Sequence, residues 1–351
     1  MFTPHIMKAV RAAIASRMPF VLYVRPFADR LDFFADPGDE FPLLSRRRFT
    51  VSSWAGGSRS AYDISDCADA DTVIALTDGG RFQSVVPSPE PWHITTPFDD
   101  YINAVDDLID RLRDSGGKTV ISRTICASGV SVDWLAVADA YFAVHPEAFR
   151  YIYYTPRHGF WLGASPELLL KVDSGRFSTM ALAGTRPLDE SDRPWSGKNI
   201  AEQAIVRNYI VDRLYDLGLA PETDPTETVT TGNIQHLRTL ISGSAGPCSA
   251  AEIIDVLNPT PALAGYPMAA ALENIVACEA HPRRCYGGYV ALTDDALTEA
   301  YVNLRCVSFD STSWCIYVGG GIMPDSDSTE EWRETEAKSL ILSNLIVEST
   351  L

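Results

Sequence analysis

The residues best suited to chemistry lie near the C-terminal end of the chain, where a glycine triplet precedes an acidic segment. Gly319-Gly320-Gly321 follows an apolar run, and Glu331, Glu334 and Lys338 come soon after it. Residues three or four apart share one face of a helix, so these carboxylates and the ammonium are expected side by side. Glycines let the backbone approach a ligand closely, and carboxylates beside exposed N–H groups suit a hard metal ion that holds an anionic substrate. The structural alternative is a solvated acidic helix after a glycine turn, because most charge clusters lie on the surface.

Three residues elsewhere in the chain could also take part in chemistry. Lys118 opens the β-branched segment 118–123, and a lysine at the mouth of a buried strand can become a base. Glu167 stands between a proline and three leucines, and a carboxylate in apolar surroundings suits a general acid. His236 lies in a segment with strand character. The structural alternatives are an exposed strand end, the first residue of a strand and a satisfied core histidine.

Hydrophobic periodicity indicates the elements that must position these residues. Helices are expected over 1–20, 97–115, 132–144, 198–217, 251–257, 267–278 and 329–346. Strands are expected over 20–24, 73–76, 118–123, 149–154, 160–163, 286–292, 298–308 and 314–318, with Arg305 inside the 298–308 strand and the glycine triplet after the last strand. Because helices and strands do not alternate, we expect an α+β fold in which helices pack outside large antiparallel sheets.

Composition restricts the partners that the chain could bind. The 351 residues carry a formal net charge of −17, which argues against nucleic acid as a partner. A small acidic metabolite would need local cations or a metal to offset this field. The seven cysteines form no CxxC pair, so we expect reduced thiols in a cytoplasmic protein and neither disulfides nor a zinc site. No apolar run reaches the ~18 residues of a membrane span.

Eight motifs in fixed order closely resemble the chorismate-utilising enzyme family, which includes isochorismate, salicylate, anthranilate and aminodeoxychorismate synthases. The motifs are Lys118-Thr-Val-Ile-Ser-Arg123, Gly163-Ala-Ser-Pro-Glu-Leu-Leu-Leu170, Ala181-Leu-Ala-Gly-Thr185, Lys198-Asn-Ile-Ala-Glu202, Pro259-Thr-Pro-Ala-Leu-Ala-Gly265, Tyr286-Gly-Gly288, Gly319-Gly-Gly-Ile322 and Glu331-Trp-Arg-Glu-Thr335. The resemblance covers residues 95–347 or so. It implies the family fold in a single chorismate-binding domain over 1–351, with a variable part at 1–95 and a catalytic core at 96–351.

The resemblance implies a Mg²⁺ site and an anion-binding pocket. Glu202 and Glu334 would bind Mg²⁺ directly, and Glu331 would act on the ion through water. The substrate carboxylates and ring would be held by Arg305, Lys338, the backbone near Gly319 and Gly321, and a pocket of Ala183, Gly184, Thr185, His236, Ala262 and Leu263. One departure is that Gln203, Ala204 and Ile205 stand where the family often has a second carboxylate.

The resemblance also implies a reaction. Lys118 would activate water for attack at C2 of chorismate, and Glu167 would protonate the departing C4 hydroxyl. Alanine at position 262 resembles the isochorismate synthases, whereas pyruvate-releasing lyases tend to carry threonine there. We therefore expect isochorismate synthase activity for menaquinone or siderophore synthesis, in a monomer without a glutaminase subunit. Salicylate synthase is the alternative enzyme, and a catalytically inactive chorismate-binding relative is the alternative from outside the enzymes.

Overall fold

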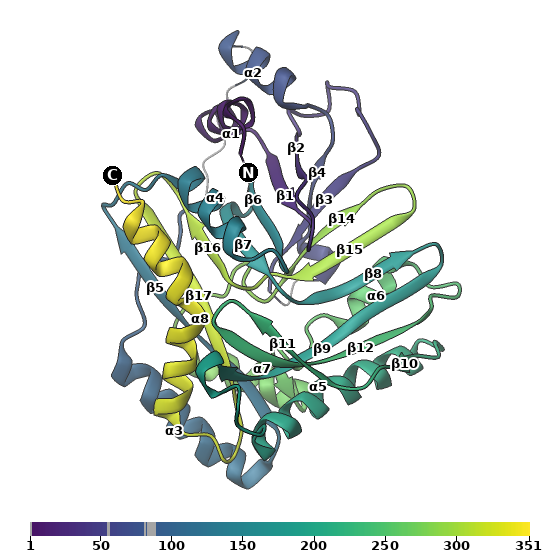
Figure 1. The fold of residues 1–351 in the computed structure, drawn as a ribbon, viewed down its shortest axis with the longest axis vertical. Coiled ribbons are helices and arrows are strands. Elements are labelled where there is room, and N and C mark those ends of the chain that lie inside the picture. The colour runs from purple at the N-terminus through teal and green to yellow at the C-terminus, as the bar shows by residue number, and fades with distance from the viewer. Residues whose placement is uncertain (1, 55–56, 81, 83–88) are drawn as a thin grey trace.

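Two large antiparallel sheets form the centre of the protein, and helices cover their outer faces (Figure 1). The structure is a computed structural model that describes residues 2–54, 57–80, 82 and 89–351. The α+β architecture expected from the sequence is confirmed. Within the described residues, no helix has both the length and the apolar character needed to cross a membrane.

The first sheet carries the strand that begins at Lys118. Its strands lie in the order β13-β5-β17-β16-β7-β6-β1-β2, and neighbours pair antiparallel throughout. Their bounds are β13 (Gly265–Tyr266), β5 (Lys118–Ser128), β17 (Ser313–Ile322), β16 (Cys306–Phe309), β7 (Gly159–Ser165), β6 (Phe149–Thr155), β1 (Phe20–Val24) and β2 (Leu31–Ala35).

The second sheet carries the wall of the candidate ring pocket. Its strands lie in the order β10-β12-β9-β8-β15-β14-β3-β4, and β11 pairs with β12. Their bounds are β10 (Glu222–Thr223), β12 (Ile234–Ser244), β9 (Arg176–Pro187), β8 (Leu168–Asp173), β15 (Leu297–Val302), β14 (Tyr289–Thr293), β3 (Arg48–Ser52), β4 (Tyr62–Ser65) and β11 (Glu227–Thr231). The N-terminal part of the chain therefore adds strands to both sheets.

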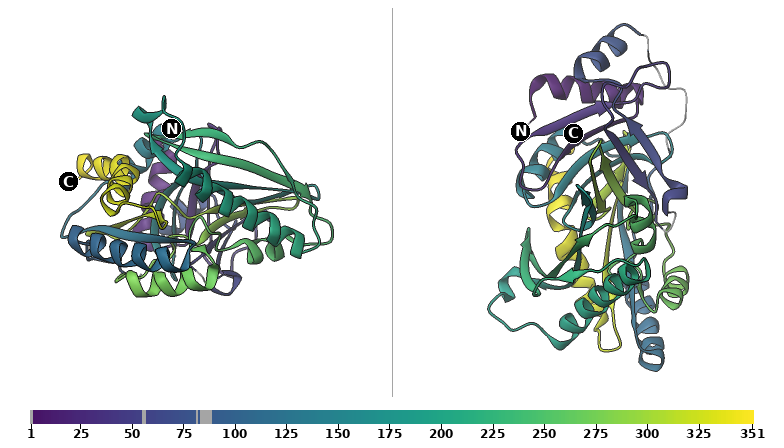
Figure 2. Two further views of the ribbon diagram at one scale, coloured as in Figure 1. Left: turned by 90° about the horizontal axis from the view of Figure 1, so that it is seen from below. Right: turned by 90° about the vertical axis from the view of Figure 1, so that its right-hand side faces the viewer.

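The helices surround the two sheets. Helices α1 and α2 lie at one end of the molecule with the N-terminal strands, and α3 and α5 lie toward the other end (Figures 1 and 2). Their bounds are α1 (Pro4–Ser16), α2 (Ala70–Asp78), α3 (Phe98–Ser115), α4 (Trp134–Val144), α5 (Gly197–Asp216), α6 (Ala250–Leu257), α7 (Met268–Cys278) and α8 (Ser328–Glu348), with short 3₁₀ turns at Gly57–Ser60 and Leu188–Glu190. Helix α8 packs against β17, and α5 packs against β9 and β12.

An aromatic core fills the space between the sheets. Side chains from both sheets meet there and are buried, and several aromatic pairs stack, such as Phe149 on Tyr301 with ring centroids 4.4 Å apart. The core includes Tyr23, Phe34, Phe49, Phe149, Tyr151, Tyr153, Trp161, Tyr301 and Tyr317. Because such rings bury large areas and prefer offset or edge contacts, this core fixes how the two sheets face each other.

Two of the short links by which the chain passes from one sheet to the other carry a candidate site residue. Pro166 and Glu167 link β7 of the first sheet to β8 of the second, and Asn303 to Arg305 link β15 of the second sheet to β16 of the first. The crossings lie side by side, because the Val302 N–H donates to the Glu167 carbonyl at 3.0 Å. The expectation of one strand over 298–308 was therefore wrong. Arg305 has a left-handed φ of 49°, which ends the ladder there.

Two other local expectations were wrong. Residues 73–76 were expected as a strand but lie in α2, which begins after Asp69; the Asp69 carboxylate accepts a hydrogen bond from the Thr72 N–H and caps the helix. The glycine triplet was expected to follow a strand that ends at Val318, and a turn there was the structural alternative, but it lies inside β17, paired with residues 120–122 of β5. The missing side chains leave room on this strand for groups from other elements.

Candidate active site

One pocket gathers most of the candidate site residues. It encloses about 640 Å³ of space between atoms, with the open solvent at its mouth included. Among its lining residues are Glu167, Ala183, Gly184, Thr185, Glu202, His236, Ala262, Leu263, Arg305, Gly319, Gly321 and Lys338. Lys118 lies behind Glu202, whereas Glu331 and Glu334 line a neighbouring pocket that shares Thr185 with the first. Segments from both sheets and from α5 and α8 thus converge on one place.

Lys118 and Glu202 form a buried ion pair beside the glycine triplet. The Lys118 side chain is 1% exposed, and its Nζ lies 2.9 Å from Glu202 Oε1. Burial raises the pKa of Glu202, but the Lys118 charge and hydrogen bond outweigh burial and hold that pKa below its usual value. A Cβ at Gly321 would lie 2.3 Å from Glu202 Oε1, so the absence of a side chain there makes room for the pair. Glu202 is therefore a buried, ionised carboxylate.

Glu167 lies in the opposite state of protonation. Its residue is 3% exposed, because the crossing between β7 and β8 places it between the two sheets. Burial raises the pKa of its carboxyl to about 8, although the charges of Lys118 and Lys338 pull the pKa down. At neutral pH Glu167 is therefore mostly protonated and can donate a proton.

His236 orients Arg305 toward the pocket. A bulge between β9 and β12 leaves Gly184 with a φ of 74°, and the Gly184 carbonyl lies 3.1 Å from His236 Nδ1. His236 Nε2 lies 3.2 Å from Arg305 Nη2. Burial and the Arg305 charge lower the pKa of His236 well below its usual value. The ring is therefore neutral, and we assign Nδ1 as its donor to Gly184 and Nε2 as its acceptor from Arg305.

Helix α8 brings two carboxylates against the glycine strand. Lys338 Nζ donates to Glu334 Oε1 at 2.6 Å and to the Gly319 carbonyl at 2.9 Å. Glu331 Oε1 accepts from Ser326 Oγ at 2.7 Å and forms a close ion pair with Lys198 of α5. Burial and the neighbouring Glu334 raise the pKa of Glu331 to about 7.

The carboxylates of α8 fit a Mg²⁺ ion in part. Glu331 Oε2 is buried and has no hydrogen-bond partner among the described residues, and it lies on the same side of Gly320 as Glu334 Oε1. Oxygen donors of this kind suit Mg²⁺, which needs few protein ligands because it retains several waters. Across the described part of the chain, however, no three His, Cys, Asp or Glu side chains converge as a metal cluster. Glu202, Glu331 and Glu334 each form an ion pair with a lysine, so a metal ion would compete with these lysines for the carboxylate oxygens.

The sequence motifs contain residues whose part in the site was not expected. Lys198 was assigned only to the start of a helix, yet it is the cation that pairs with Glu331. Tyr286, from the Tyr-Gly-Gly motif, lines the pocket beside Gly319. The spacing of four between Lys198 and Glu202 places both on one face of α5, and this signal could have identified the lysine.

The fold and the pocket define a class of protein: two stacked antiparallel sheets that enclose a site with a buried acid, a buried lysine and several further cations. The sequence model of the family described as chorismate binding enzyme matches residues 83–346. This match spans most of the chain, and the chain belongs to that family.

Relatives of known activity include isochorismate and anthranilate synthases. The chain is 31% identical to isochorismate synthase EntC of Escherichia coli over 242 residues, which cover 65% of this chain and 62% of that protein. It is 29% identical to isochorismate synthase DhbC of Bacillus subtilis over 74% of this chain and 69% of the relative. It is 29% identical to anthranilate synthase component 1 of Halobacterium salinarum over 77% of this chain and 57% of the relative. The matched region thus spans less than two thirds of EntC.

Solved structures share the fold at low sequence identity. The menaquinone-specific isochorismate synthase MenF of Escherichia coli has a TM-score of 0.75 and 19% identity, with 98% of this chain and 91% of that chain covered. Anthranilate synthase component I of Streptococcus pneumoniae has a TM-score of 0.68 and 15% identity, with 93% and 92% covered. The fold is therefore common to family members with different products.

Proposed function

We propose that this protein is an isochorismate synthase that converts chorismate to isochorismate with Mg²⁺. The observation that carries the proposal is the protonation of Glu167, whose pKa of about 8 makes it a proton donor in a pocket that is also lined by Glu202, the ion-pair partner of Lys118. An acid and a base in one site are what an exchange of hydroxyl position requires. The isochorismate synthases among the relatives support this choice.

Lys118 would serve as the base and Glu167 as the acid. Water attacks C2 and gives up a proton to the Lys118 amine, the ring double bonds shift, and the C4 hydroxyl leaves as water after it takes the Glu167 proton. Lys118 Nζ is engaged by Glu202 Oε1 at 2.9 Å, so a base role requires that this ion pair opens when the site is loaded.

The cations of the pocket would hold the two carboxylates of chorismate. Arg305, aimed by His236, and Lys338, beside Gly319, are the side chains available for this in the pocket. Glu334, Glu331 and Glu202 would hold Mg²⁺. The bound ion would supply positive charge for a substrate carboxylate and would compete with Lys118 for Glu202. These local charges offset the net charge of −17.

Ala262 bears on whether the reaction stops at isochorismate. It lines the pocket next to Leu263, and alanine there supports the synthase over a pyruvate-releasing lyase. Ala262→Thr should then permit some release of pyruvate. The relatives include a menaquinone-specific and a 2,3-dihydroxybenzoate-specific synthase, and we propose that the product enters menaquinone or catechol siderophore synthesis.

The experiment that tests this function is incubation of the purified protein with chorismate and Mg²⁺, with chromatography of the products and a parallel pyruvate assay. We expect isochorismate without pyruvate and no product after addition of EDTA. Salicylate with pyruvate would establish a lyase, and unchanged chorismate would contradict the proposal. Lys118→Ala should lower kcat by about 10²-fold or more, the usual contribution of a general base, while chorismate binding measured by calorimetry persists.

A further inference from the structure

Strand β5, which carries Lys118, lacks a neighbouring strand along most of one edge. On one side it pairs with β17 from Thr119 to Ser128. On the other side β13 pairs only with Lys118 and Thr119. Backbone groups of an open edge need other partners, because an unpaired buried N–H or C=O group is costly.

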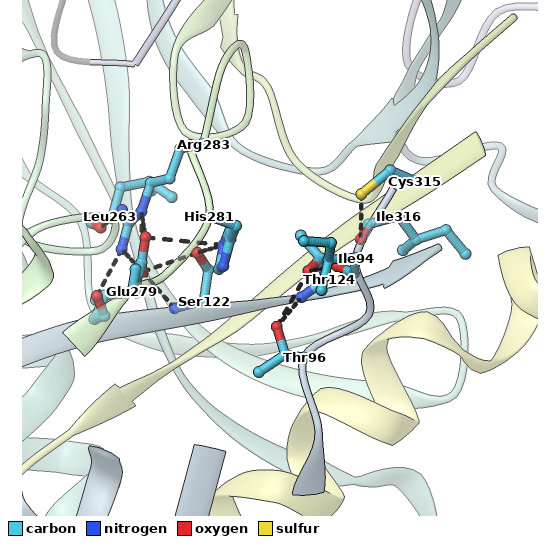
Figure 3. Close-up of polar contacts among 11 residues, drawn as sticks. Ile94, Thr96, Ser122, Thr124, Leu263, Glu279, His281, Arg283, Cys315 and Ile316 are labelled. Carbon is cyan, nitrogen blue, oxygen red and sulfur yellow. Dashed lines mark hydrogen bonds and ion pairs between the residues drawn. The ribbon is translucent and has the colours of Figure 1, made fainter. Parts of the chain in front are cut away.

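A buried ion pair continues the ladder where β13 ends. Arg283 Nη2 donates to the Val120 carbonyl at 2.7 Å, and the Ser122 N–H donates to Glu279 Oε1 at 2.7 Å. Arg283 Nε and Nη2 bind the Glu279 carboxylate at 2.9 and 2.6 Å. The two side chains, which are 1% and 3% exposed, thus bind β5 as a strand would (Figure 3). Farther along, the Thr124 N–H donates to Thr96 Oγ1.

The same guanidinium also binds the loop that precedes β13, the segment that pairs with this end of β5. Arg283 Nη1 donates to the Leu263 carbonyl at 2.7 Å (Figure 3). Val120 and Leu263 both line the candidate active site, whereas Arg283 and Glu279 do not. Through one rigid, planar group, the strand that begins with Lys118 is therefore linked to the loop that carries Ala262.

We propose that Glu279 and Arg283 act as positioning residues for the reaction, by fixing Lys118 relative to the Ala262–Leu263 wall. This inference rests on the proposed function. A buried ion pair adds little net stability, because loss of hydration offsets the attraction, so its placement of the backbone is the larger effect. Lysine could not replace Arg283, because a single ammonium cannot reach both carbonyls and both carboxylate oxygens in a fixed fork.

The test compares Arg283→Lys with Arg150→Lys. Arg150 is a matched control, since it is also buried and binds the backbone carbonyls of Phe142, Arg25 and Ala28, yet it does not line the pocket. We expect Arg283→Lys to lower kcat about tenfold or more, as a small misplacement of a reacting group does, with a smaller change in KM for chorismate. Arg150→Lys should lower the unfolding temperature and leave kcat unchanged. A loss of stability without a loss of kcat in Arg283→Lys would overturn the proposal.

Hydrogen exchange separates this inference from the proposed function. In Arg283→Lys the amides of residues 118–124 should exchange faster than in the wild type, and in Arg150→Lys they should not. This readout needs no turnover, so a wild type that leaves chorismate unchanged would refute the function while the exchange still reports on β5. If Arg283→Lys fails to fold, Glu279→Gln replaces it with the same expectations, and unaltered exchange at 118–124 in that variant would overturn the positioning role.

Discussion

At the scale of single residues, two carboxylates of one pocket differ in protonation because their neighbours differ. Glu202 lies 2.9 Å from the Lys118 ammonium, and its pKa is lowered although burial opposes this. At Glu167 burial outweighs the charges of Lys118 and Lys338 and raises the pKa to about 8. At neutral pH the pocket can therefore hold both a protonated carboxyl that acts as a general acid and an ionised carboxylate that binds a cation. Other enzymes also use their surroundings to give two carboxyl groups these different roles.

The pH dependence of activity should reflect Glu167. Its acid form is the active form, so kcat/KM for chorismate should fall as the pH rises through about 8. Glu167→Gln should lower kcat by about 10²-fold or more and should lose this alkaline limb. Steady-state rates between pH 6 and pH 10 or so check the expectation, and an alkaline limb that persists unchanged in the variant would assign it to another group.

The pH dependence of stability should reflect the same residue. The folded pKa of Glu167 lies above the ordinary value of 4.5, so its contribution to stability is complete below that value and is lost as the pH rises through about 8. Glu167→Gln has no titrating group at this position. As the pH rises over this range, the free energy of unfolding of the wild type should therefore fall relative to that of the variant, by on the order of a few kcal/mol. Urea unfolding of both proteins at the two ends of the range measures the gain, and a difference that is independent of pH would contradict the assigned pKa.

At the scale of elements, strand β17 is built to lie against other groups. Each residue of the triplet faces a different element: Gly319 lies near Tyr286, Gly320 near Glu331 and Glu334, and Gly321 near Glu202. A side chain on this strand would occupy the space of the charged groups from α5 and α8. The triplet therefore lets side chains from other elements approach the backbone of β17, and it does not form a turn.

Two alanine substitutions on β17 should differ in effect. A Cβ at Gly321 would lie 2.7 Å from Lys118 Cε and closer still to Glu202, whereas one at Gly320 would lie 3.2 Å from the nearest atom, Glu331 Oε2. Gly321→Ala should therefore lower kcat about tenfold or more by moving the ion pair, and Gly320→Ala should have the smaller effect. Steady-state kinetics together with thermal unfolding of both variants test this, and equal losses of kcat would show that this spacing does not matter.

At the scale of the whole molecule, the proposed metal site joins two halves of the fold. Glu202 comes from α5, which packs on the second sheet, and Glu334 comes from α8, which packs on the first. An ion bound between them would link the sheets across the pocket. Because such a site exists only in the folded chain, ion binding should stabilise the fold.

Mg²⁺ should therefore raise the unfolding temperature. At about 100 times its Kd, a ligand of the folded state adds about 2.7 kcal/mol. Glu334→Gln should weaken this effect and raise the Mg²⁺ concentration needed for half-maximal activity, whereas Glu336→Gln, an exposed position on the same helix, should change neither. Thermal unfolding with and without Mg²⁺ measures the shift, and an equal shift in the Glu334 variant would remove this residue from the metal site.

Local sequence signals predicted most of the elements near the site but not how they meet. The helices at 97–115 and 198–217 were expected within a residue or two of α3 and α5. The strand at 298–308 was predicted as one element, although it changes sheets at Arg305, because a continuous apolar pattern fits strands of either sheet. The segment 73–76 was predicted as a strand because Val73 and Ile74 are β-branched, but the Asp69 cap begins a helix that includes it.

The sequence by itself determined the family, the residue types of the site and their order along the chain. Only the tertiary structure decided that Lys118 pairs with Glu202 and Lys198 with Glu331, that Glu167 is protonated, and that Arg283 completes the edge of β5. The reason is physical: protonation depends on burial and on nearby charges, and an edge depends on which strand is absent. In this fold those neighbours come from segments far apart in the sequence, 133 residues for Lys198 and Glu331, and no local pattern records them.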